Sequence, residues 1–274
     1  CCEDYKKSDS PPNVLFILVD DLGWKDLGCY GSSFYETPNI DRLADMGFRF
    51  SQAYSAHPVC SPTRAAIMTG KHPTRLNITD WIPGQNPKNR KLLGPDDLHD
   101  LPLEEFTVAE ALKKEGYKTF FAGKWHLGEN YPMRPEDQGF EEVLIHKSGG
   151  IGQAPDTDAN YFNPILWRNG EQLKANGYCT DLFFDAAIQF LRLDSEKPFF
   201  VYIAPNVPHT PLEIARAYSQ PFLDRGIDPR TAAIYGMLKN LDENFAALLQ
   251  AIDEEGLVDE TLIIFMTDNG STRG

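Results

Sequence analysis

Polar residues that could do chemistry follow four apolar stretches of this sequence. They are Asp20, Asp21, Lys124, His126, His209, Asp268 and Asn269. Three carboxylates and one amide oxygen form a hard, oxygen-only ligand set, which suits Ca²⁺ or Mg²⁺ and suits zinc or copper poorly. Carboxylates gathered without a cation would repel one another. We therefore expect a divalent-cation site, flanked by basic side chains that could hold an anion.

Each of these groups also has an ordinary structural explanation. Two aspartates after a strand are usually a turn or a helix cap, Asp-Asn-Gly is a common turn, and a lone histidine in a loop usually lies at the surface. The prediction of a single site therefore depends on whether the four groups meet in the fold.

A solitary cysteine at the start of a predicted helix is the second chemical feature. In HPVCSPTRAAIMTG, residues 57–70, Ser61 could cap the helix and Pro62 could be its first residue, so that Cys60 lies just ahead of it. Free N–H groups there favour an anion and would lower the pKa of a cysteine, which could then be a nucleophile. A small buried hydrophobic role is the alternative. Arg64 adds a positive charge nearby.

Alternating strand and helix patterns would position these residues. Apolar runs predict buried strands at 13–19, 117–123, 198–204 and 261–267, and amphipathic segments predict helices at 38–46, 108–115, 180–193 and 235–256. This order predicts an α/β fold with a largely parallel central sheet and helices on both faces. Ligands in such folds bind beyond the carboxyl ends of the strands, so the polar groups should meet at one edge of the sheet.

Composition and charge limit the classes of partner. The 274 residues are 42% hydrophobic and 24% charged, which is typical of a globular protein with a sizeable core. The formal net charge of −14 would repel phosphate backbones, so we expect no nucleic-acid partner. The longest apolar run, residues 14–19, is too short to cross a bilayer, and we expect no transmembrane segment.

The N-terminal residues suggest export. Cys1 and Cys2 precede a polar segment, so residues 1–12 are interpreted as a tether, and a mature N-terminal cysteine is typical of bacterial lipoproteins. A fragment boundary is the alternative. The five cysteines lack the spacing of a disulfide framework or a zinc site. We expect a periplasmic or cell-surface protein, with lipid attachment at Cys1 as a hypothesis.

The motif CSPTR, residues 60–64, matches the C-x-P-x-R signature of the sulfatase family. The stretches NVLFILVDDLGW, TPNIDRLADMGFRF, GKWHLG, PHTP and TLIIFMTDNG resemble family segments and occur in the family order. From about Asn13 onward the chain therefore resembles the formylglycine-dependent, type I sulfatases of bacteria, within the alkaline phosphatase-like superfamily. The resemblance implies a sulfatase catalytic domain over residues 13–274.

The resemblance also implies a role for each candidate residue. The metal, usually Ca²⁺, would be bound by Asp20, Asp21, Asp268, Asn269 and the modified Cys60. In the family, this cysteine is converted to formylglycine (3-oxoalanine) by a formylglycine-generating or sulfatase-maturating enzyme, which would be a partner of this chain. Arg64 would stabilise the hydrated aldehyde, and Lys124 would contact the sulfate.

The implied reaction is the hydrolysis of a sulfate ester in two steps. A hydroxyl of the hydrated aldehyde attacks sulfur and expels the alcohol, to which His209, also a substrate contact, donates a proton. His126 then helps to remove a proton from the remaining hydroxyl, so that inorganic sulfate leaves. The substrate would be a sulfated carbohydrate or an aryl sulfate.

Residues 146–156, HKSGGIGQAPD, are less decisive. Ser148 or His146 could lie near the sulfate, but a plain flexible loop is the slightly favoured explanation.

The end of the chain differs from the family pattern. Family members continue beyond the Asp-Asn pair with a second sulfate-contacting lysine and a C-terminal subdomain, which we expect to be absent from these 274 residues. The expected type of reaction refers to the intact enzyme. Activity of these 274 residues without those parts is a separate expectation.

Two alternatives stay open at this point. A phosphatase or phosphonate monoester hydrolase shares the parent fold, although a phosphate ester carries more charge and calls for further cations. A non-catalytic, sugar-binding descendant of a sulfatase would keep carbohydrate affinity but would leave Cys60 unmodified.

Overall fold

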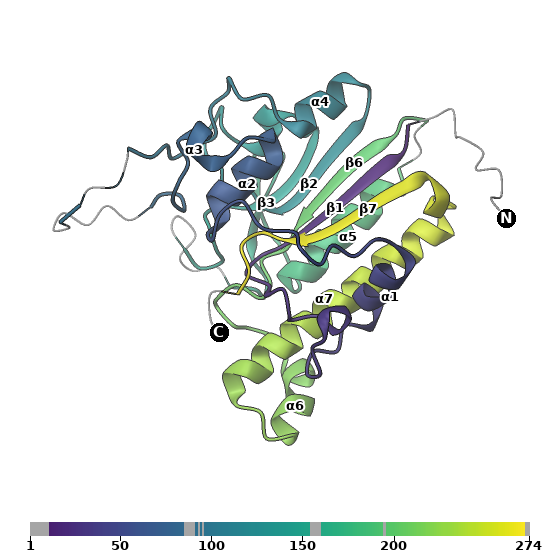
Figure 1. The fold of residues 1–274 in the computed structure, drawn as a ribbon. Helices are drawn as coiled ribbons and strands as arrows, with labels where there is room; N and C mark the ends of the chain where they lie inside the picture. The colour runs from purple at the N-terminus through teal and green to yellow at the C-terminus, as the bar shows by residue number, and fades with distance from the viewer. Residues whose placement is uncertain are drawn as a thin grey trace.

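The computed structural model describes residues 11–84, 91–92, 94, 96–153, 160–193 and 196–271. Among them, seven strands form one sheet in the order β5-β4-β3-β2-β6-β1-β7 (Figure 1). The strands are β1 (Asn13–Val19), β2 (Lys118–Lys124), β3 (Glu142–His146), β4 (Ile165–Arg168), β5 (Glu171–Lys174), β6 (Phe199–Ala204) and β7 (Thr261–Thr267). Five neighbouring strands are parallel to one another: β3, β2, β6, β1 and β7. Strand β4 runs antiparallel to β3, and β5 runs antiparallel to β4. The prediction of a largely parallel sheet is confirmed, with an unpredicted antiparallel hairpin at one edge.

Helices cover both faces of this sheet (Figure 1). They are α1 (Pro38–Met46), α2 (Cys60–Thr69), α3 (Pro73–Leu76), α4 (Val108–Lys114), α5 (Cys179–Leu191), α6 (Arg216–Asp224) and α7 (Pro229–Glu254), with the 3-10 helices η1 (Gly28–Tyr30), η2 (Pro135–Gln138) and η3 (Val258–Glu260). On one face, α5 and α7 pack against Leu15 and Ile17 of β1. On the other face, α2 and α4 pack against Leu18 and Phe121. The two-sided apolar strands therefore separate two hydrophobic layers, as the sequence predicts.

Side-chain hydrogen bonds, both local and distant in sequence, explain where several helices begin. Thr107 and Glu110 form a capping box at the start of α4. Helix α1 begins at Pro38 and is capped from a distance, because the buried carboxylate of Asp242 in α7 accepts hydrogen bonds from the backbone N–H groups of Asn39 and Ile40. Helix α7 begins before the predicted residue 235, because the side chain of Asp228 caps it.

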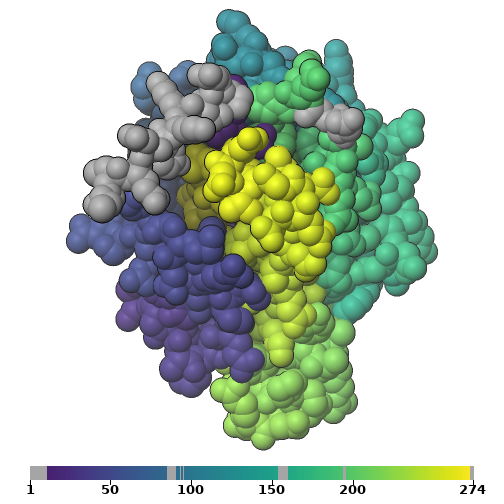
Figure 2. Space-filling model, turned by 90° about the vertical axis from the view of Figure 1, so that its right-hand side faces the viewer, coloured from purple at the N-terminus to yellow at the C-terminus, as the bar shows by residue number. Residues whose placement is uncertain are grey.

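Strand β7 lies at an edge of the sheet. Within the described residues it pairs only with β1, from Asn13 opposite Thr261 to Val19 opposite Thr267. Most of its side chains are partly exposed, and Leu262 is exposed. Figure 2 shows the C-terminal part of the chain, in yellow, at the molecular surface. This strand nevertheless carries Asp268 to the carboxyl end of the sheet, beside the end of β1.

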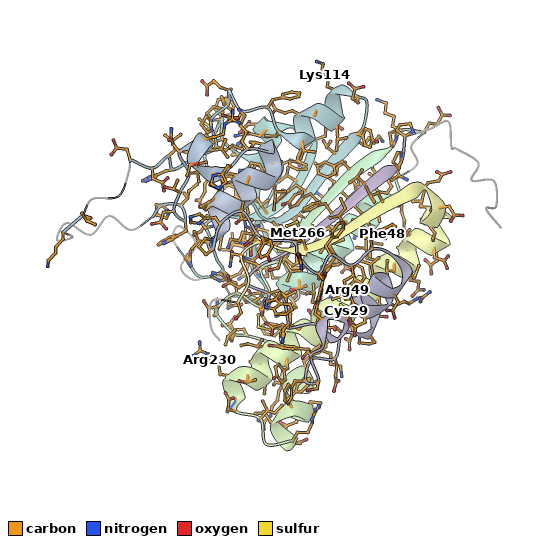
Figure 3. All side chains as sticks on the ribbon, viewed as in Figure 1. Cys29, Phe48, Arg49, Lys114, Arg230 and Met266 are labelled. Carbon is orange, nitrogen blue, oxygen red and sulfur yellow. The ribbon has the colours of Figure 1, made fainter. Side chains whose placement is uncertain are left out.

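The cysteines of the described residues are free thiols, at positions 29, 60 and 179. Cys29 lies near the surface, where its carbonyl oxygen accepts a hydrogen bond from Arg49 (Figure 3). Cys1 and Cys2, proposed as the lipid-attachment end of the tether, lie outside the described residues. Of the helices in the described segments, none is both long and apolar enough to span a bilayer.

Candidate active site

The four polar groups meet at the carboxyl edge of the sheet. Asp20 follows β1, and its two carboxylate oxygens accept hydrogen bonds from Nζ of Lys124, the last residue of β2, at 2.9 and 2.7 Å. Asp268 follows β7, and its side chain accepts a hydrogen bond from the backbone N–H of Asp21 at 3.2 Å. Nε2 of His209, in the loop after β6, lies 3.9 Å from a carboxylate oxygen of Asp21. The convergence expected from the order of strands is therefore present.

Arg64 ties these segments together. Its Nη2 contacts Asp20 at 3.1 Å and Asp268 at 2.8 Å, and its Nη1 donates to the carbonyl of Lys124 at 2.8 Å. The side chain is 2% exposed, although it carries a full charge. One arginine on α2 thus joins the ends of β1, β2 and β7.

Two of the three predicted acidic ligands, Asp20 and Asp21, lie with Cys60 as a cation site would require, whereas Asp268 lies outside this cluster. One ligand atom from each of Asp20, Asp21 and Cys60 lies within 4.8 Å of the others. Nδ2 of Asn269 donates to Asp21 at 2.7 Å, which leaves Oδ1 of Asn269 buried and without a hydrogen-bond partner among the described residues. Carboxylate and amide oxygens are the ligands that Ca²⁺ and Mg²⁺ prefer. The residues present therefore fit a hard divalent cation.

Unpartnered polar atoms gather at this edge. Among the described residues, buried side-chain nitrogen or oxygen atoms without a hydrogen bond include Arg64 Nε, His126 Nδ1, His146 Nε2, Asn206 Nδ2, Asn206 Oδ1 and Asn269 Oδ1. Buried polar groups in native proteins usually have partners, so such a group of exceptions points to a bound ligand or ordered water. The sequence analysis named His146 as a possible neighbour of the sulfate but gave Asn206 no role; the position of Asn206 two residues after β6 is the signal that could have found it.

The electrostatics of the edge follow from burial and proximity. Burial alone would raise the pKa of Asp20, but Lys124 and Arg64 hold it well below its usual value. Burial and the charge of Asp20 raise the pKa of Asp268. Burial would lower the pKa of Lys124, but Asp20 outweighs it and keeps the ammonium charged. The low pKa of Asp20 and the raised pKa of Asp268 reflect two neighbouring carboxylates that share the positive charges of Arg64 and Lys124.

Cys60 differs from its prediction in two ways. It is the first residue of α2, preceded by Val59, whereas the Oγ of Ser61 accepts a hydrogen bond from the backbone N–H of Ile82. The expected cap at Ser61 is therefore wrong, and the helix begins two residues before Pro62. Burial raises the pKa of Cys60 to about 12, and nearby carboxylates add to the effect despite Lys124. The expected lowering of this pKa is also wrong, because burial outweighs the helix N-terminus, and the thiol is a poor nucleophile at neutral pH.

The two candidate histidines have defined tautomers. Nε2 of His126 bonds to the carbonyl of Ile82 at 2.6 Å, and Nδ1 of His209 bonds to the carbonyl of Thr210 at 2.7 Å. A carbonyl only accepts, so each of these nitrogens carries the proton. In its neutral form, each ring would present a lone pair at the other nitrogen, Nδ1 of His126 and Nε2 of His209. Burial and Lys124 lower the pKa of His126 far below its usual value, which keeps this ring neutral.

Ser148 lies in a tight turn after β3, beside the same edge. It is 8% exposed and has a positive φ of 76°, and its Oγ donates to the side chain of Gln153 at 3.4 Å. Gln153 also returns a backbone hydrogen bond to the carbonyl of Gly150 at 3.2 Å. In its described part, this segment forms a hydrogen-bonded turn, and its flexibility stays a prediction.

Comparison with known proteins places the chain in a family. The family model described as Sulfatase matches residues 12–274. The chain belongs to the sulfatase family. Human arylsulfatase A is 34% identical to this sulfatase-family chain over 297 residues, with 95% of the chain and 52% of the relative covered. Human N-acetylgalactosamine-6-sulfatase is also 34% identical, over 275 residues, with 95% and 50% covered.

Solved structures agree with this sulfatase fold. The crystal structure of Ps i-CgsB in complex with k-i-k-neocarrahexaose has a TM-score of 0.83 and 31% identity, and covers 96% of this chain and 59% of that one. The chain thus spans about half the length of the curated relatives it matches. The expected alkaline phosphatase-like α/β fold is confirmed.

Proposed function

We propose that the whole protein hydrolyses sulfate esters and releases inorganic sulfate. The observation that carries the proposal is the position of Cys60 at the first turn of α2, where its Sγ lies 3.7 Å from Asp20. Arg64 and Lys124 approach the same carboxylate from α2 and β2. A residue at this place, within the CSPTR motif of a sulfatase-family chain, is suited to hold the reacting group against a metal and two cations.

The proposed cofactors are a divalent cation and a modified Cys60. Ca²⁺, or Mg²⁺, would be held by Asp20, Asp21, Asp268 and Asn269, together with residue 60, and would supply positive charge to the nucleophile and the sulfuryl oxygens. Formylglycine, formed from Cys60 by a maturating enzyme, would supply a hydrated aldehyde as the nucleophile. The raised pKa of the unmodified thiol supports this assignment, because the thiol itself would react poorly.

The chain's own side chains would bind the substrate and move protons. Lys124 and Arg64 would attract the sulfate and offset the charge that builds on its oxygens. His209, when protonated at Nε2, would donate to the leaving oxygen, and its partly exposed position beside Asp21 supports that role. His126 would accept a proton at Nδ1, the nitrogen without a hydrogen-bond partner in the described part of the chain. Ser148 would lie near the bound sulfate.

The substrate class is proposed to be sulfated carbohydrate. N-acetylgalactosamine-6-sulfatase and a protein crystallised with k-i-k-neocarrahexaose are among the similar proteins. Aryl sulfates would serve as test substrates. Export from a bacterial cell and lipid attachment at Cys1 stay predictions, and Cys1 lies outside the described residues.

Phosphate esters are the alternative substrates. The two cationic side chains at this edge already form ion pairs: Lys124 with Asp20, and Arg64 with Asp20 and Asp268. A phosphate monoester carries more negative charge than a sulfate monoester and would need further cations. The charge balance therefore favours the sulfate ester.

The first experiment measures the mass of the peptide that contains residue 60. The full-length protein would be co-expressed with a formylglycine-generating enzyme, and release of sulfate from 4-nitrophenyl sulfate and a panel of sulfated sugars would be measured. We expect an aldehyde or its hydrate at residue 60, and loss of about 10⁴-fold or more of the activity in Cys60→Ala. An unmodified thiol with retained sugar binding would contradict the proposal and favour a non-catalytic sugar-binding protein. Phosphate release exceeding sulfate release would favour the phosphatase alternative.

A further inference from the structure

Two consecutive glycines after β3 lie against the two candidate proton-transfer histidines. A Cβ atom placed on Gly149 would lie 2.4 Å from both Cε1 and Nε2 of His126. A Cβ atom placed on Gly150 would lie 2.8 Å from Cε1 and 3.1 Å from Nδ1 of His209. Non-bonded carbon atoms prefer separations of about 3.5–4.0 Å, so neither position has room for a side chain while the rings stay in place.

The backbone does not explain these glycines. The left-handed conformation, which usually requires glycine, occurs at Ser148, whose φ is 76°, and not at Gly149 or Gly150. A left-handed backbone is therefore not what requires glycine at either position. The histidine rings, rather than the shape of the turn, are what exclude a side chain there.

Each ring meets a backbone carbonyl and one of the glycines at the same end. His126 donates from Nε2 to the carbonyl of Ile82, and Gly149 lies beside the same end of the ring. His209 donates from Nδ1 to the carbonyl of Thr210, and Gly150 lies next to that nitrogen. A side chain at either glycine would push the ring away from the carbonyl that fixes its tautomer.

The turn itself is anchored. Ser148 donates to Gln153, and the backbone N–H of Gln153 donates to the carbonyl of Gly150. The side-chain nitrogen of Gln153 lies 3.1 Å from the place of a Cβ on Gly150, so an added methyl group would meet this side chain as well as the ring of His209. At Gly149 the three nearest atoms all belong to the ring of His126, so that ring would have to move.

We infer that Gly149 and Gly150 are positioning residues, each of which sets the ring of one proton-transfer histidine: Gly149 for His126 and Gly150 for His209. The inference rests on the proposed function, because it uses the roles proposed there for the two histidines. A single turn would then control both steps of hydrolysis, through a different residue for each step.

The Gly150→Ala variant tests the first step. If His209 protonates the leaving alcohol, the loss in kcat/KM should depend on the leaving group. We expect a loss of roughly 10- to 100-fold on a sugar sulfate, because a small misplacement of a catalytic group has an effect of that size. The loss on 4-nitrophenyl sulfate should be small, because nitrophenolate leaves without a proton.

The Gly149→Ala variant tests the second step. Displacement of His126 should lower kcat by roughly 10- to 100-fold, both on a sugar sulfate and on 4-nitrophenyl sulfate. With 4-nitrophenyl sulfate, release of nitrophenol should show a burst close to one equivalent per active site, followed by slow turnover, because the alcohol is released before sulfate. Gly47→Ala is the matched control, because a Cβ there would lie at an ordinary 3.4 Å from its nearest neighbour.

Double variants separate positioning from a general effect on the fold. In a His126→Ala background the ring is gone, so adding Gly149→Ala should cause no further loss of activity, and the same holds for Gly150→Ala with His209→Ala. An independent further loss in either pair would overturn the inference. So would single alanine variants with wild-type rates and wild-type leaving-group dependence.

Crystal structures of the two alanine variants make the inference testable without activity. We expect His126 to lose its hydrogen bond to Ile82 in Gly149→Ala, and His209 to lose its bond to Thr210 in Gly150→Ala. Rings that stay in place would overturn the inference even if activity falls. Absence of sulfate-ester turnover in the modified wild type would instead overturn the proposed function, while the ring positions would still decide whether the glycines set them.

Discussion

Arg64 at the sheet edge and Arg192 at the end of α5 form ion pairs of the same length in opposite surroundings. Arg64 contacts Asp268 at 2.8 Å and is 2% exposed, and Arg192 contacts Glu254 of α7 at 2.8 Å and is 50% exposed. Water screens the exposed pair, which contributes at most about 1 kcal/mol. The buried pair has lost its hydration, at a cost of several kcal/mol per ion. Equal distances therefore do not imply equal contributions to stability.

The comparison suggests why the buried charges are there. Replacing a buried ion pair by apolar residues of similar volume is often neutral or stabilising, so stability alone does not account for Arg64, Lys124, Asp20 and Asp268 at one place. The same edge also holds the unpartnered atoms of Asn206 and Asn269. Buried charges and buried polar atoms without hydrogen bonds both lower the stability of the folded protein. Both also suit a site that binds a cation and an anion.

The largest expected effect is on folding stability when Arg64 is removed. Arg64→Met leaves the carboxylates of Asp20 and Asp268 buried with less positive charge, so the free energy of unfolding should fall by about 3–5 kcal/mol. Urea unfolding at neutral pH measures it. An effect below 1 kcal/mol would mean that the buried pair behaves like the exposed one.

A slightly smaller effect is expected from the buried ring of His146. Burial lowers the pKa of His146 from 6.5 to about 4. Between these values the unfolded chain binds more protons than the folded one, so stability falls as the pH is lowered from 6.5 to 4. Comparing urea unfolding of the wild type and His146→Phe at both pH values should show roughly 3 kcal/mol less acid-dependent loss in the variant. If the wild type and the variant lose the same stability between the two pH values, His146 binds its proton as readily in the folded protein as in the unfolded chain.

Asp268→Asn separates ligand binding from stability. Burial and Asp20 raise the pKa of Asp268, so removing its charge should leave the metal-free protein about as stable as before. Its affinity for Ca²⁺ should fall by roughly 100-fold. Calorimetric titration with Ca²⁺ and urea unfolding of the metal-free forms measure the two quantities. Unchanged Ca²⁺ affinity would remove Asp268 from the proposed ligand set.

The smallest effect is expected at the exposed pair. Arg192→Met makes the same chemical change as Arg64→Met, but Glu254 and Glu255 regain water when their partner is lost. The free energy of unfolding should change by about 1 kcal/mol or less. A loss similar to that of Arg64→Met would show that exposure is not what distinguishes the two pairs.

The central strands and the site edge could be predicted because their sequence signals are local and strong. The runs that form β1, β2, β6 and β7 are apolar on both faces, and each is followed directly or closely by polar residues. Strands β4 and β5 have only four residues each and mostly face solvent on one side, so their periodicity is weak. Their turn at Asn169-Gly170, with positive φ at both residues, is a hairpin signal that could have revealed them.

Other features depend on three-dimensional surroundings that no local pattern contains. Pro221 inside α6 argues against a helix in the sequence, yet α6 packs along α7. The pKa of Cys60 depends on how deeply residues distant in sequence bury it, which outweighs the helix start. The requirement for glycine at 149 and 150 arises from rings in two other segments.

The position of β1 has a consequence for the order of events during synthesis. This first strand is hydrogen-bonded between β6 and β7, which begin at Phe199 and Thr261. Asp20 and Asp21 can therefore reach their final places only after nearly all of the 274 residues have been made. Until then the carboxylate of Asp20, which lies 3.7 Å from the Cys60 thiol in the folded chain, is not held beside it. The interval between synthesis of residue 60 and closure of the sheet is the time in which the proposed maturating enzyme would have access to this thiol.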